Sequence, residues 1–370
     1  MRTEVYFFLY GEINTDGRVQ RSMDFLRSIG NLEIHLVSCG LIDYPIDGVI
    51  QHQIKLKPLG FKNYWRFWQE AKTIIKSVET KTTLFYLHDY YSMLLAPIVK
   101  AVKGVFIYDA HELLIKAPGQ KYTLREKLFI WVERKWAKDA YKVIAANVER
   151  ENVMRDVYKL TNTMNILNIA DYKYQQIAGS IKNDINWVVY QGVITESRKL
   201  SFFICALKYL PSSYKLMFIG GGPDGGQGDR ALLENIAQVE GVQSRVLFTG
   251  RMANKDMMER LKECKVGIIT YPFNTYNNIY CSPNKLYEYT AIGMPVISSK
   301  QPFLEKVVNE YHIGELFDFE DRQTFATNIE KIVSNYDAYT KNISKFICDY
   351  NIENEKHKFV NALSPLFEHS

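Results

Sequence analysis

The segment SPNKLYEYTAIGMPVISS, residues 282–299, places one lysine and one carboxylate in the first turns of an expected helix. Ser282 before Pro283 is typical of an N-cap followed by the first helical residue. Gly293 and then Pro295 are typical of a helix end. The segment therefore predicts a helix of about ten residues that carries its charged side chains near its start.

These charged side chains could bind a nucleotide. Glu288 stands four residues after Asn284 and three after Lys285, so a helix places all three on one face. The free N–H groups and positive dipole end of a helix favour phosphate, and Lys285 adds a positive charge. A carboxylate repels phosphate, but Glu288 could accept two hydrogen bonds from the vicinal diol of a ribose. The alternative is a solvated glutamate on a helix surface.

The neighbouring runs predict where this helix lies in the fold. Residues 265–270, KVGIIT, and residues 295–298, PVIS, are short apolar runs with β-branched residues, which indicates buried strands. A strand, a helix and another strand in this order form a βαβ unit with parallel strands. Ligands of such sheets bind beyond the carboxyl ends of the strands, and the start of the helix lies there.

The same alternation of strand and helix patterns extends along the chain. Strand patterns are expected at residues 5–10, 33–39, 83–89, 104–112, 141–147, 186–192, 214–219 and 245–250. Helical patterns are expected at residues 17–30, 63–79, 123–138, 201–210, 230–239 and 254–264. Two successive α/β halves predict two Rossmann-like, doubly wound domains that face a cleft. We expect them at residues 1–170 and 171–350, with a C-terminal helix in 351–370 that crosses back to the first domain.

Composition narrows the class of protein. The chain has 370 residues, 47% hydrophobic and 24% charged, with a net charge of +5, which is typical of a soluble globular protein of two domains. No apolar run is long enough for a signal peptide or a membrane span, so we expect a cytoplasmic protein. The five scattered cysteines indicate reduced thiols and neither a disulfide framework nor a zinc site.

Several segments carry a resemblance to a known family. Residues 283–298, PNKLYEYTAIGMPVIS, are similar to the E-A-M-A-x-G-x-P-V segment of retaining glycosyltransferases of family 4. Supporting segments, in the family's order, are DGRVQR (16–21), HDYY (88–91), YDAHEL (108–113), YQGVITESRKL (190–200), FIGGGP (218–223) and VLFTGRM (246–252). The resemblance covers nearly the whole chain and implies the GT-B fold. It also implies a donor, UDP- or GDP-linked, held mainly by the second domain, and an acceptor held mainly by the first.

The resemblance implies roles for residues of the second half. Arg198 matches the basic residue on the donor diphosphate, where a fixed cation stabilises charge that grows as the glycosidic bond breaks. Glu288 matches the ribose-binding carboxylate, and Met252 the position whose backbone pairs with the base. The implied donor segment also contains three further residues: Ser282, Asn284 and Lys285.

In the first half, His111 matches a histidine near the donor sugar, and Gly17 matches a turn that closes over the donor phosphate. His88 and Asp89 end the neighbouring strand, where they could line the acceptor pocket. For each histidine the alternative is a structural role with satisfied hydrogen bonds, and for Gly17 it is a plain turn.

One position departs from the family pattern. The family has a further glutamate before the ribose-binding carboxylate, with seven residues between the two, and this chain has Tyr280 at that position. The departure affects recognition of the donor sugar. The chain also lacks an Asp-x-Asp pair, which would hold a divalent ion on the diphosphate, so we predict a metal-independent enzyme without a cofactor.

The predicted function is transfer of a sugar, with retention of configuration, from a nucleotide-sugar donor to a saccharide or lipid-linked acceptor in cell-surface polysaccharide assembly. Two alternatives remain open. A nucleotide-sugar 2-epimerase shares the GT-B fold, and Tyr280 makes a non-catalytic GT-B partner subunit conceivable. Arg198, Lys285 and Glu288 argue against the subunit, because an inactive protein needs no donor site.

Basic charge is concentrated in residues 51–150, which hold 18 Lys and Arg against 9 Asp and Glu. Residues 61–76, FKNYWRFWQEAKTIIK, interleave aromatic and basic side chains, as a helix at an anionic membrane surface does. Tyr64, Phe67 and Ala71 fall at helical spacing, so part of this stripe must be core. We predict peripheral association with the inner face of the cell membrane and no binding of nucleic acid.

Overall fold

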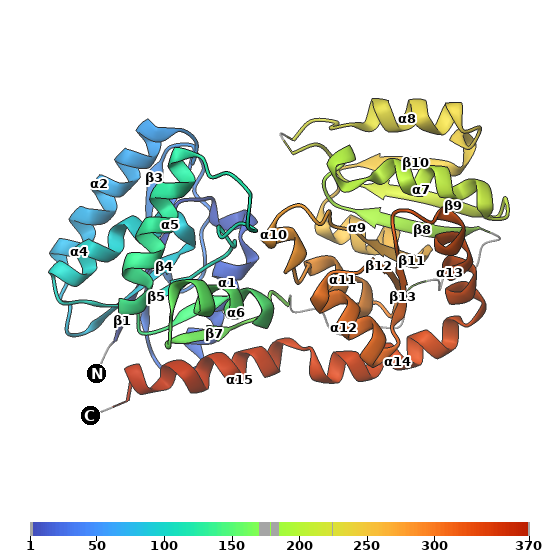
Figure 1. Ribbon diagram of the computed structural model, residues 1–370. Coiled ribbons are helices and arrows are strands. Elements are labelled where there is room, and N and C mark those ends of the chain that lie inside the picture. Colours follow the sequence, from blue (N-terminus) through green and yellow to red (C-terminus); the bar gives the residue numbers. More distant parts are fainter. Residues whose placement is uncertain (1–2, 170–177, 179–184, 224, 369–370) are drawn as a thin grey trace. The chain divides into compact units, whose positions relative to one another are not determined.

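The computed structural model describes residues 3–169, 178, 185–223 and 225–368, which form two compact α/β units (Figure 1). The first unit comprises Met1–Asn168 and Ile352–Ser370, and the second comprises Ile169–Asn351. The expected domain boundary between residues 170 and 171 lies outside the described residues. All five cysteines are free thiols, as expected.

The first unit is built on a seven-stranded parallel sheet in the order β3-β2-β1-β4-β5-β6-β7. Its strands are β1 (Glu4–Leu9), β2 (Glu33–Gly40), β3 (Val49–Lys55), β4 (Thr83–His88), β5 (Val105–Asp109), β6 (Val143–Ala145) and β7 (Thr163–Asn165). Its helices are α1 (Gly17–Arg27), α2 (Phe61–Ser77), α3 (Asp89–Ser92), α4 (Ala96–Ala101), α5 (Leu124–Trp136), α6 (Val148–Tyr158) and α15 (Ile352–Leu363). The strand order reverses direction between β1 and β4, so the switch point of the sheet lies there.

The central strands of this sheet are buried on both faces, which explains their continuous apolar sequence. On one face, Phe359 of α15 packs against Phe25 of α1 and Tyr86 of β4, with ring centroids 5.5 and 6.4 Å apart. Glu355 of the same helix accepts a hydrogen bond from the Leu167 backbone at 2.7 Å. The C-terminal helix is therefore part of the first unit's core.

The second unit has a six-stranded parallel sheet in the order β10-β9-β8-β11-β12-β13. Its strands are β8 (Asn186–Gln191), β9 (Tyr214–Ile219), β10 (Val246–Gly250), β11 (Cys264–Ile269), β12 (Val296–Ser299) and β13 (Gly314–Phe317). Its helices are α7 (Leu200–Ala206), α8 (Arg230–Val239), α9 (Asn254–Leu261), α10 (Tyr276–Ile279), α11 (Asn284–Ala291), α12 (Pro302–Tyr311), α13 (Arg322–Ser334) and α14 (Tyr336–Asp349). Here the switch point lies between β8 and β11.

The fold class predicted from the sequence, two Rossmann-like parallel-sheet units, is confirmed. Edge strand β3 and the short strand β7 were not expected, because half-exposed or three-residue strands lack a long apolar run. The predicted core positions Phe67 and Ala71 of α2 are buried, whereas Tyr64 is half-buried and donates its hydroxyl to the Tyr91 carbonyl at 2.7 Å. None of the described helices is long and apolar enough to cross a bilayer.

Candidate active site

The carboxyl ends of β8 and β11 bring together residues from three segments of the second unit. Gln191 ends β8, Tyr271 follows β11, and α11 begins shortly after them in the chain. Because β8 and β11 are neighbours at the switch point, a ligand of this sheet is expected at this edge. The predicted residues Arg198, Lys285 and Glu288 all lie around it.

Arg198 and Lys285 share one aromatic side chain. The Arg198 guanidinium lies 4.2 Å from the Tyr271 ring centroid, and the Lys285 ammonium lies 5.2 Å from the same centroid and 4.4 Å from that of Tyr190. One buried guanidinium nitrogen of Arg198, Nη1, has no hydrogen-bond partner among the described residues. Two cations thus converge with donor capacity left over, which is the arrangement that an anion would satisfy.

Lys285 is buried, with 9% of its surface exposed, contrary to an ordinary surface lysine at a helix start. Burial, and then the charge of Arg198, lower the pKa of Lys285 to about 7, while Glu288 acts in the opposite direction. The ammonium is therefore close to losing its proton at neutral pH. A bound anion would restore its full charge.

Glu288 lies beside the cation pair and is held by the end of β8. Its carboxylate accepts a hydrogen bond from the side-chain amide of Gln191, whose own Oε1 is buried without a partner in the described part of the chain. Burial raises the pKa of Glu288, and Lys285 and Gln191 oppose that shift. The carboxylate is thus fixed one turn into α11, within reach of a ligand that also contacts Lys285.

The start of α11 differs from the expectation. The helix begins at Asn284 with Pro283 in the N-cap position, and no side chain caps it. Ser282 is not the cap, because its hydroxyl is 2.6 Å from the Tyr287 hydroxyl instead. Asn284 is exposed at the first helical position. Within this first turn the Leu286 N–H donates to the Pro283 carbonyl at 3.0 Å.

Two glycines keep the backbone close to the cations. Gly192 has φ of +132°, and a Cβ there would lie 3.5 Å from the Lys285 Nζ. Gly220, in the turn FIGGGP, has φ of +143°, and a Cβ there would lie 1.9 Å from the Gly192 carbonyl oxygen. Neither position accommodates a side chain without strain, so the backbone of Gly220 can pack directly against Gly192, which lies next to Lys285.

The other residues of the second unit that the sequence singled out are Lys199, Met252 and Tyr280. Lys199 follows Arg198 but points its ammonium at the Phe319 ring, 4.5 Å from the centroid, as expected for a lysine outside the site. Met252 follows β10, two strands along from β8, and is 38% exposed. Tyr280 follows α10 and packs its ring against Tyr276, with centroids 5.2 Å apart.

In the first unit, a cavity of about 180 Å³ lies at the switch point between β1 and β4, and we call it the polar pocket. Its polar lining includes Glu12, Asp16, His88, Asp89 and His111. Three residues predicted from the sequence, His88, Asp89 and His111, are therefore brought together. Asp89 has φ of +59°, and its buried Oδ1 has no partner among the described residues, so a ligand hydroxyl could bond to it.

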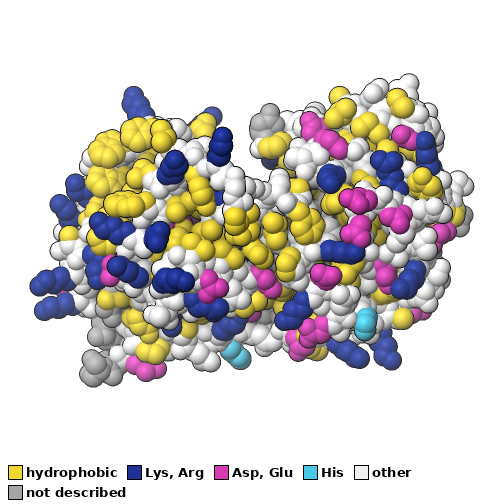
Figure 2. Space-filling model, in the orientation of Figure 1, with side chains coloured by type: hydrophobic (Ala, Val, Ile, Leu, Met, Phe, Trp, Pro, Cys, Tyr) yellow, Lys and Arg dark blue, Asp and Glu magenta, His cyan; other side chains and the backbone are white. Residues whose placement is uncertain are grey.

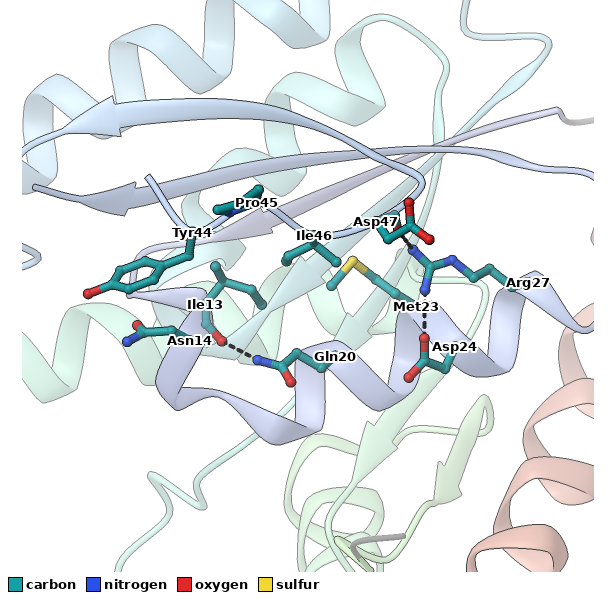
Figure 3. A pocket seen from close by; sticks show the side chains of 10 residues that line it. All are labelled: Ile13, Asn14, Gln20, Met23, Asp24, Arg27, Tyr44, Pro45, Ile46 and Asp47. Carbon is teal, nitrogen blue, oxygen red and sulfur yellow. Dashed lines mark hydrogen bonds and ion pairs between the residues drawn. The ribbon is translucent and has the colours of Figure 1, made fainter. Parts of the chain in front are cut away.

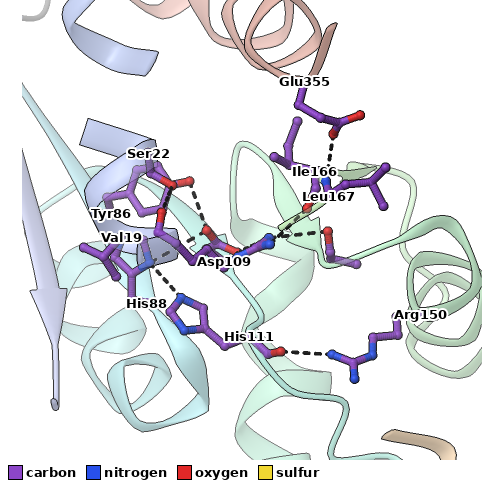
Figure 4. A network of polar contacts seen from close by, with 12 residues as sticks. Val19, Ser22, Tyr86, His88, Asp109, His111, Arg150, Ile166, Leu167 and Glu355 are labelled. Atoms are coloured by element: carbon purple, nitrogen blue, oxygen red, sulfur yellow. Dashed lines mark hydrogen bonds and ion pairs between the residues drawn. The ribbon is translucent and has the colours of Figure 1, made fainter. Parts of the chain in front are cut away.

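The two histidines form part of a buried polar network (Figure 4). His88 Nδ1 lies 3.0 Å from His111 Nε2 and 3.7 Å from Asp109 Oδ2. Burial lowers the pKa of both histidines. His88 Nε2 is buried without a partner in the described structure, which favours a proton on His88 Nδ1 that is donated to His111.

That tautomer leaves the proton of His111 on Nδ1, which lies 3.5 Å from an Asp16 carboxylate oxygen. Asp109 is in turn paired with the buried Arg18, with 2.7 Å between Nη2 and Oδ1. Among the described residues, His88, Asp109 and His111 could offer ligand atoms to a metal ion, because these atoms lie within 4.8 Å of one another. Arg18 neutralises Asp109 and the histidines bond to each other, so the group forms a hydrogen-bonded network in which His88 Nε2 has no partner among the described residues.

Gly17 begins α1, but the adjacent amides have a partner. Asp16 accepts hydrogen bonds from the N–H groups of Arg18 and Val19 at 3.2 and 3.1 Å. Gly17 does not have a positive φ. The proposed contact of this turn with phosphate therefore competes with the Asp16 carboxylate, and the role of Gly17 stays a prediction.

A further cavity of about 410 Å³ in the first unit contains none of the predicted residues (Figure 3). It lies between α1 and the segment of residues 44–47. Arg27 at its edge is already engaged by Asp24, at 2.7 Å, and by the Asp47 carbonyl. The lining of this cavity shares no residue with that of the polar pocket, so the two cavities are separate.

Comparisons with known proteins agree with this geometry. Residues 175–346 match the family model of glycosyl transferases group 1. A comparison with curated proteins finds no significant match. The chain thus contains a group 1 glycosyltransferase domain, and the protein is a glycosyltransferase.

Solved structures resemble the whole chain at low sequence identity. Sucrose-phosphate synthase from Thermosynechococcus elongatus is 16% identical with a TM-score of 0.78, and the match covers 99% of each chain. HepE from Anabaena in complex with UDP is 15% identical with a TM-score of 0.70, covering 99% of this chain and 100% of that one. Its complex with UDP-glucose is 15% identical with a TM-score of 0.69, covering 98% and 99%. These similarities establish the GT-B fold.

Proposed function

We propose that the protein transfers a sugar from a nucleotide-sugar donor to a saccharide acceptor with retention of configuration, as family 4 glycosyltransferases do. The second unit holds the donor, with Arg198 and Lys285 on the diphosphate and Glu288 on the ribose diol. Ser282, Asn284 and Met252 belong to the same donor site. The first unit holds the acceptor in the polar pocket, with His111 acting at the donor sugar and His88 and Asp89 on the acceptor side.

The convergence of Arg198 and Lys285 on Tyr271, with an unsatisfied guanidinium nitrogen, is the observation that carries this proposal. A diphosphate supplies the missing negative charge, and its charge increases as the bond to the sugar breaks. Cations and a helix N-terminus can stabilise a leaving diphosphate, so the reaction is proposed to need neither a metal ion nor another cofactor.

A donor panel tests the proposal. Thermal-shift and calorimetric titrations of the purified protein with UDP, GDP and their sugars should identify one base, and UDP is tried first because HepE binds it. Donor hydrolysis should then release nucleoside diphosphate and a sugar of unchanged anomeric configuration. Failure to bind any member of the panel contradicts the donor site. Binding without hydrolysis favours a partner subunit, and release of a 2-epimer favours an epimerase.

The pKa of Lys285 predicts that UDP binding takes up a proton. Lys285 has a pKa of about 7 in the free protein, and a bound diphosphate raises it. UDP affinity should therefore fall as pH rises from 7 to 9, by at most tenfold per unit. Calorimetry in buffers of different ionisation heats measures the proton directly.

The matched control is Lys285→Met, which has no proton to gain. Its UDP affinity should be lower and flat between pH 7 and 9. A flat profile for the wild-type protein would mean that Lys285 does not meet the diphosphate.

His111→Ala should lower kcat while UDP affinity is nearly unchanged. The neutral imidazole is proposed to contact the sugar, whereas Arg198, Lys285 and Glu288, which are proposed to hold the nucleotide, lie in the second unit. Steady-state rates and calorimetry on the same preparation separate the two effects. His357→Ala, an exposed histidine of α15, is the control and should have full activity. A fully active His111→Ala variant would return His111 to a structural role.

We further propose that the acceptor is lipid-linked, that the enzyme acts in cell-surface polysaccharide assembly, and that it works at the cytoplasmic face of the membrane. Trp65 of α2 and Trp131 of α5 are 49% and 56% exposed, and apolar side chains gather over these helices (Figure 2). Lys135 lies 4.9 Å from the Trp131 ring centroid. Exposed tryptophans beside lysines are suited to an anionic headgroup layer.

Vesicle co-sedimentation tests the membrane proposal. The protein should bind anionic vesicles at low salt, release at high salt, and ignore neutral vesicles. The double variant Trp65→Ser, Trp131→Ser should bind less, because both indoles leave the interface. An absence of binding to either kind of vesicle at low salt ends this proposal.

A further inference from the structure

A third cavity of the first unit, about 320 Å³, lies beside the polar pocket and has an apolar wall. The loop of residues 58–60, the start of α2 and the first half of α5 form it, and we call it the apolar cavity. Its rim includes Leu59 and Phe61, which are 76% and 80% exposed, and Leu128, which is 48% exposed. Large apolar side chains left this exposed around a concavity are typical of a binding site.

The apolar cavity adjoins the polar pocket. Tyr10 and Tyr91 line both, and their ring centroids lie 5.3 Å apart. On one side of this tyrosine pair are Asp16, Asp89 and His111, and on the other are leucine and phenylalanine side chains. A single ligand in contact with both must therefore be polar at one end and apolar at the other.

A cation stands at the rim of the apolar cavity. The Arg125 guanidinium lies 5.1 Å from the Tyr91 ring centroid and 5.9 Å from that of Phe129, and it donates a hydrogen bond to the Tyr91 hydroxyl. Within the part of the chain that the structure describes, Arg125 forms no ion pair with a carboxylate. Neighbouring Glu126 pairs with Lys116, at 2.7 Å. The positive charge of Arg125 thus remains available to an anion.

We propose that the apolar cavity binds the hydrocarbon part of an amphiphilic acceptor, whose phosphate contacts Arg125 and whose sugar hydroxyl enters the polar pocket. This inference rests on the proposed function and specifies its acceptor. Because the two cavities share Tyr10 and Tyr91, the apolar group is attached close to the reacting hydroxyl. The enzyme then acts early on a growing chain, when the sugar is still next to its carrier.

The probes are n-hexyl, n-octyl and n-decyl phosphate below their micelle concentrations, titrated into the full-length protein by calorimetry. Each added methylene should strengthen binding by about three- to four-fold, which corresponds to about 0.8 kcal/mol per buried methylene. Octyl β-glucoside, which is uncharged, should bind more weakly than octyl phosphate. In Arg125→Gln this preference for phosphate should disappear.

Three exposed leucines provide the matched variants. Leu128→Asp and Leu59→Asp place a carboxylate at the cavity and should weaken octyl phosphate binding at least about tenfold, with UDP affinity unchanged. Leu124→Asp, on the same helix but outside the cavity and 86% exposed, should bind like the wild type.

The outcomes separate this inference from the proposed function. In one outcome, wild-type protein binds UDP while its affinity for alkyl phosphates does not change with chain length. That result contradicts the proposed role of the apolar cavity and leaves the proposed donor site unaffected. An equal loss in Leu124→Asp and Leu128→Asp also contradicts it, because general adsorption to the surface then explains the binding. If the affinity for alkyl phosphates rises with chain length but UDP does not bind, the proposed role of the apolar cavity is supported and the proposed donor site is contradicted.

Discussion

Arg198→Ala is expected to lower kcat by about 10²–10³-fold, the effect of removing one preorganised donor from a developing anion. The loss of UDP affinity should be smaller, because the leaving diphosphate gains charge only as the glycosidic bond breaks. Stopped assays of sugar transfer or donor hydrolysis, together with calorimetric UDP titration, give the two quantities on one preparation.

The chain offers a close control for this change. Lys199→Asn removes the same unit charge one residue further on, where the ammonium contacts Phe319, and asparagine tolerates the left-handed backbone of that position. Lys199→Asn should keep nearly full activity. If Arg198→Ala lowers kcat and UDP affinity by the same factor, Arg198 binds the ground state and has no special role in bond cleavage.

Glu288→Ala should weaken UDP binding by about 2–4 kcal/mol, since hydrogen bonds to a charged group contribute about 1.5–3 kcal/mol each and do not add fully. Whether Glu288 bonds to the ribose diol is tested with 2′-deoxy-UDP, which lacks one hydroxyl of that diol. Wild-type protein should discriminate strongly against 2′-deoxy-UDP, and Glu288→Ala should bind both nucleotides alike. Calorimetry of the four combinations forms a double-mutant cycle.

Glu288→Gln keeps the shape and one acceptor, so its affinity should lie between those of the wild type and the alanine variant. Melting temperatures of the unliganded proteins show whether the fold is kept. Undiminished discrimination against 2′-deoxy-UDP in Glu288→Ala means that another group holds the ribose.

Much of the proposed donor site could be suggested from the sequence because its residues are local in the chain. A helix start, a lysine and a glutamate lie within seven residues, and helical spacing alone relates Lys285 to Glu288. The burial of Lys285 was not predictable, because it depends on Tyr190 of β8 and on Tyr271, which follows β11. The only indication in the sequence was that both tyrosines lie at the carboxyl ends of predicted strands. Those two strands, β8 and β11, are neighbours in the sheet.

The polar pocket illustrates the same limit. The sequence indicated His88 and His111 at strand ends, and the register pairs His88 with Asp109, two residues before His111. Arg18 and Asp109 were missed, because a buried ion pair between α1 and β5 joins positions far apart in the chain. Ser282 was assigned wrongly as a cap, because its hydroxyl has Tyr287 as a competing partner that local pattern does not reveal.

The position of α15 has a consequence for how the protein is made. Phe359 completes the core formed by α1 and β4, yet it is synthesised after the whole of Ile169–Asn351. At about 5–20 residues per second, translation of that insert takes on the order of 10–40 s. Throughout this interval the nascent first unit exposes the apolar surface of Phe25 and Tyr86 that Phe359 later covers. We therefore expect chaperones to bind the ribosome-bound chain. A premature stop codon shortly before α15 would leave the second unit complete and the first unit without part of its core.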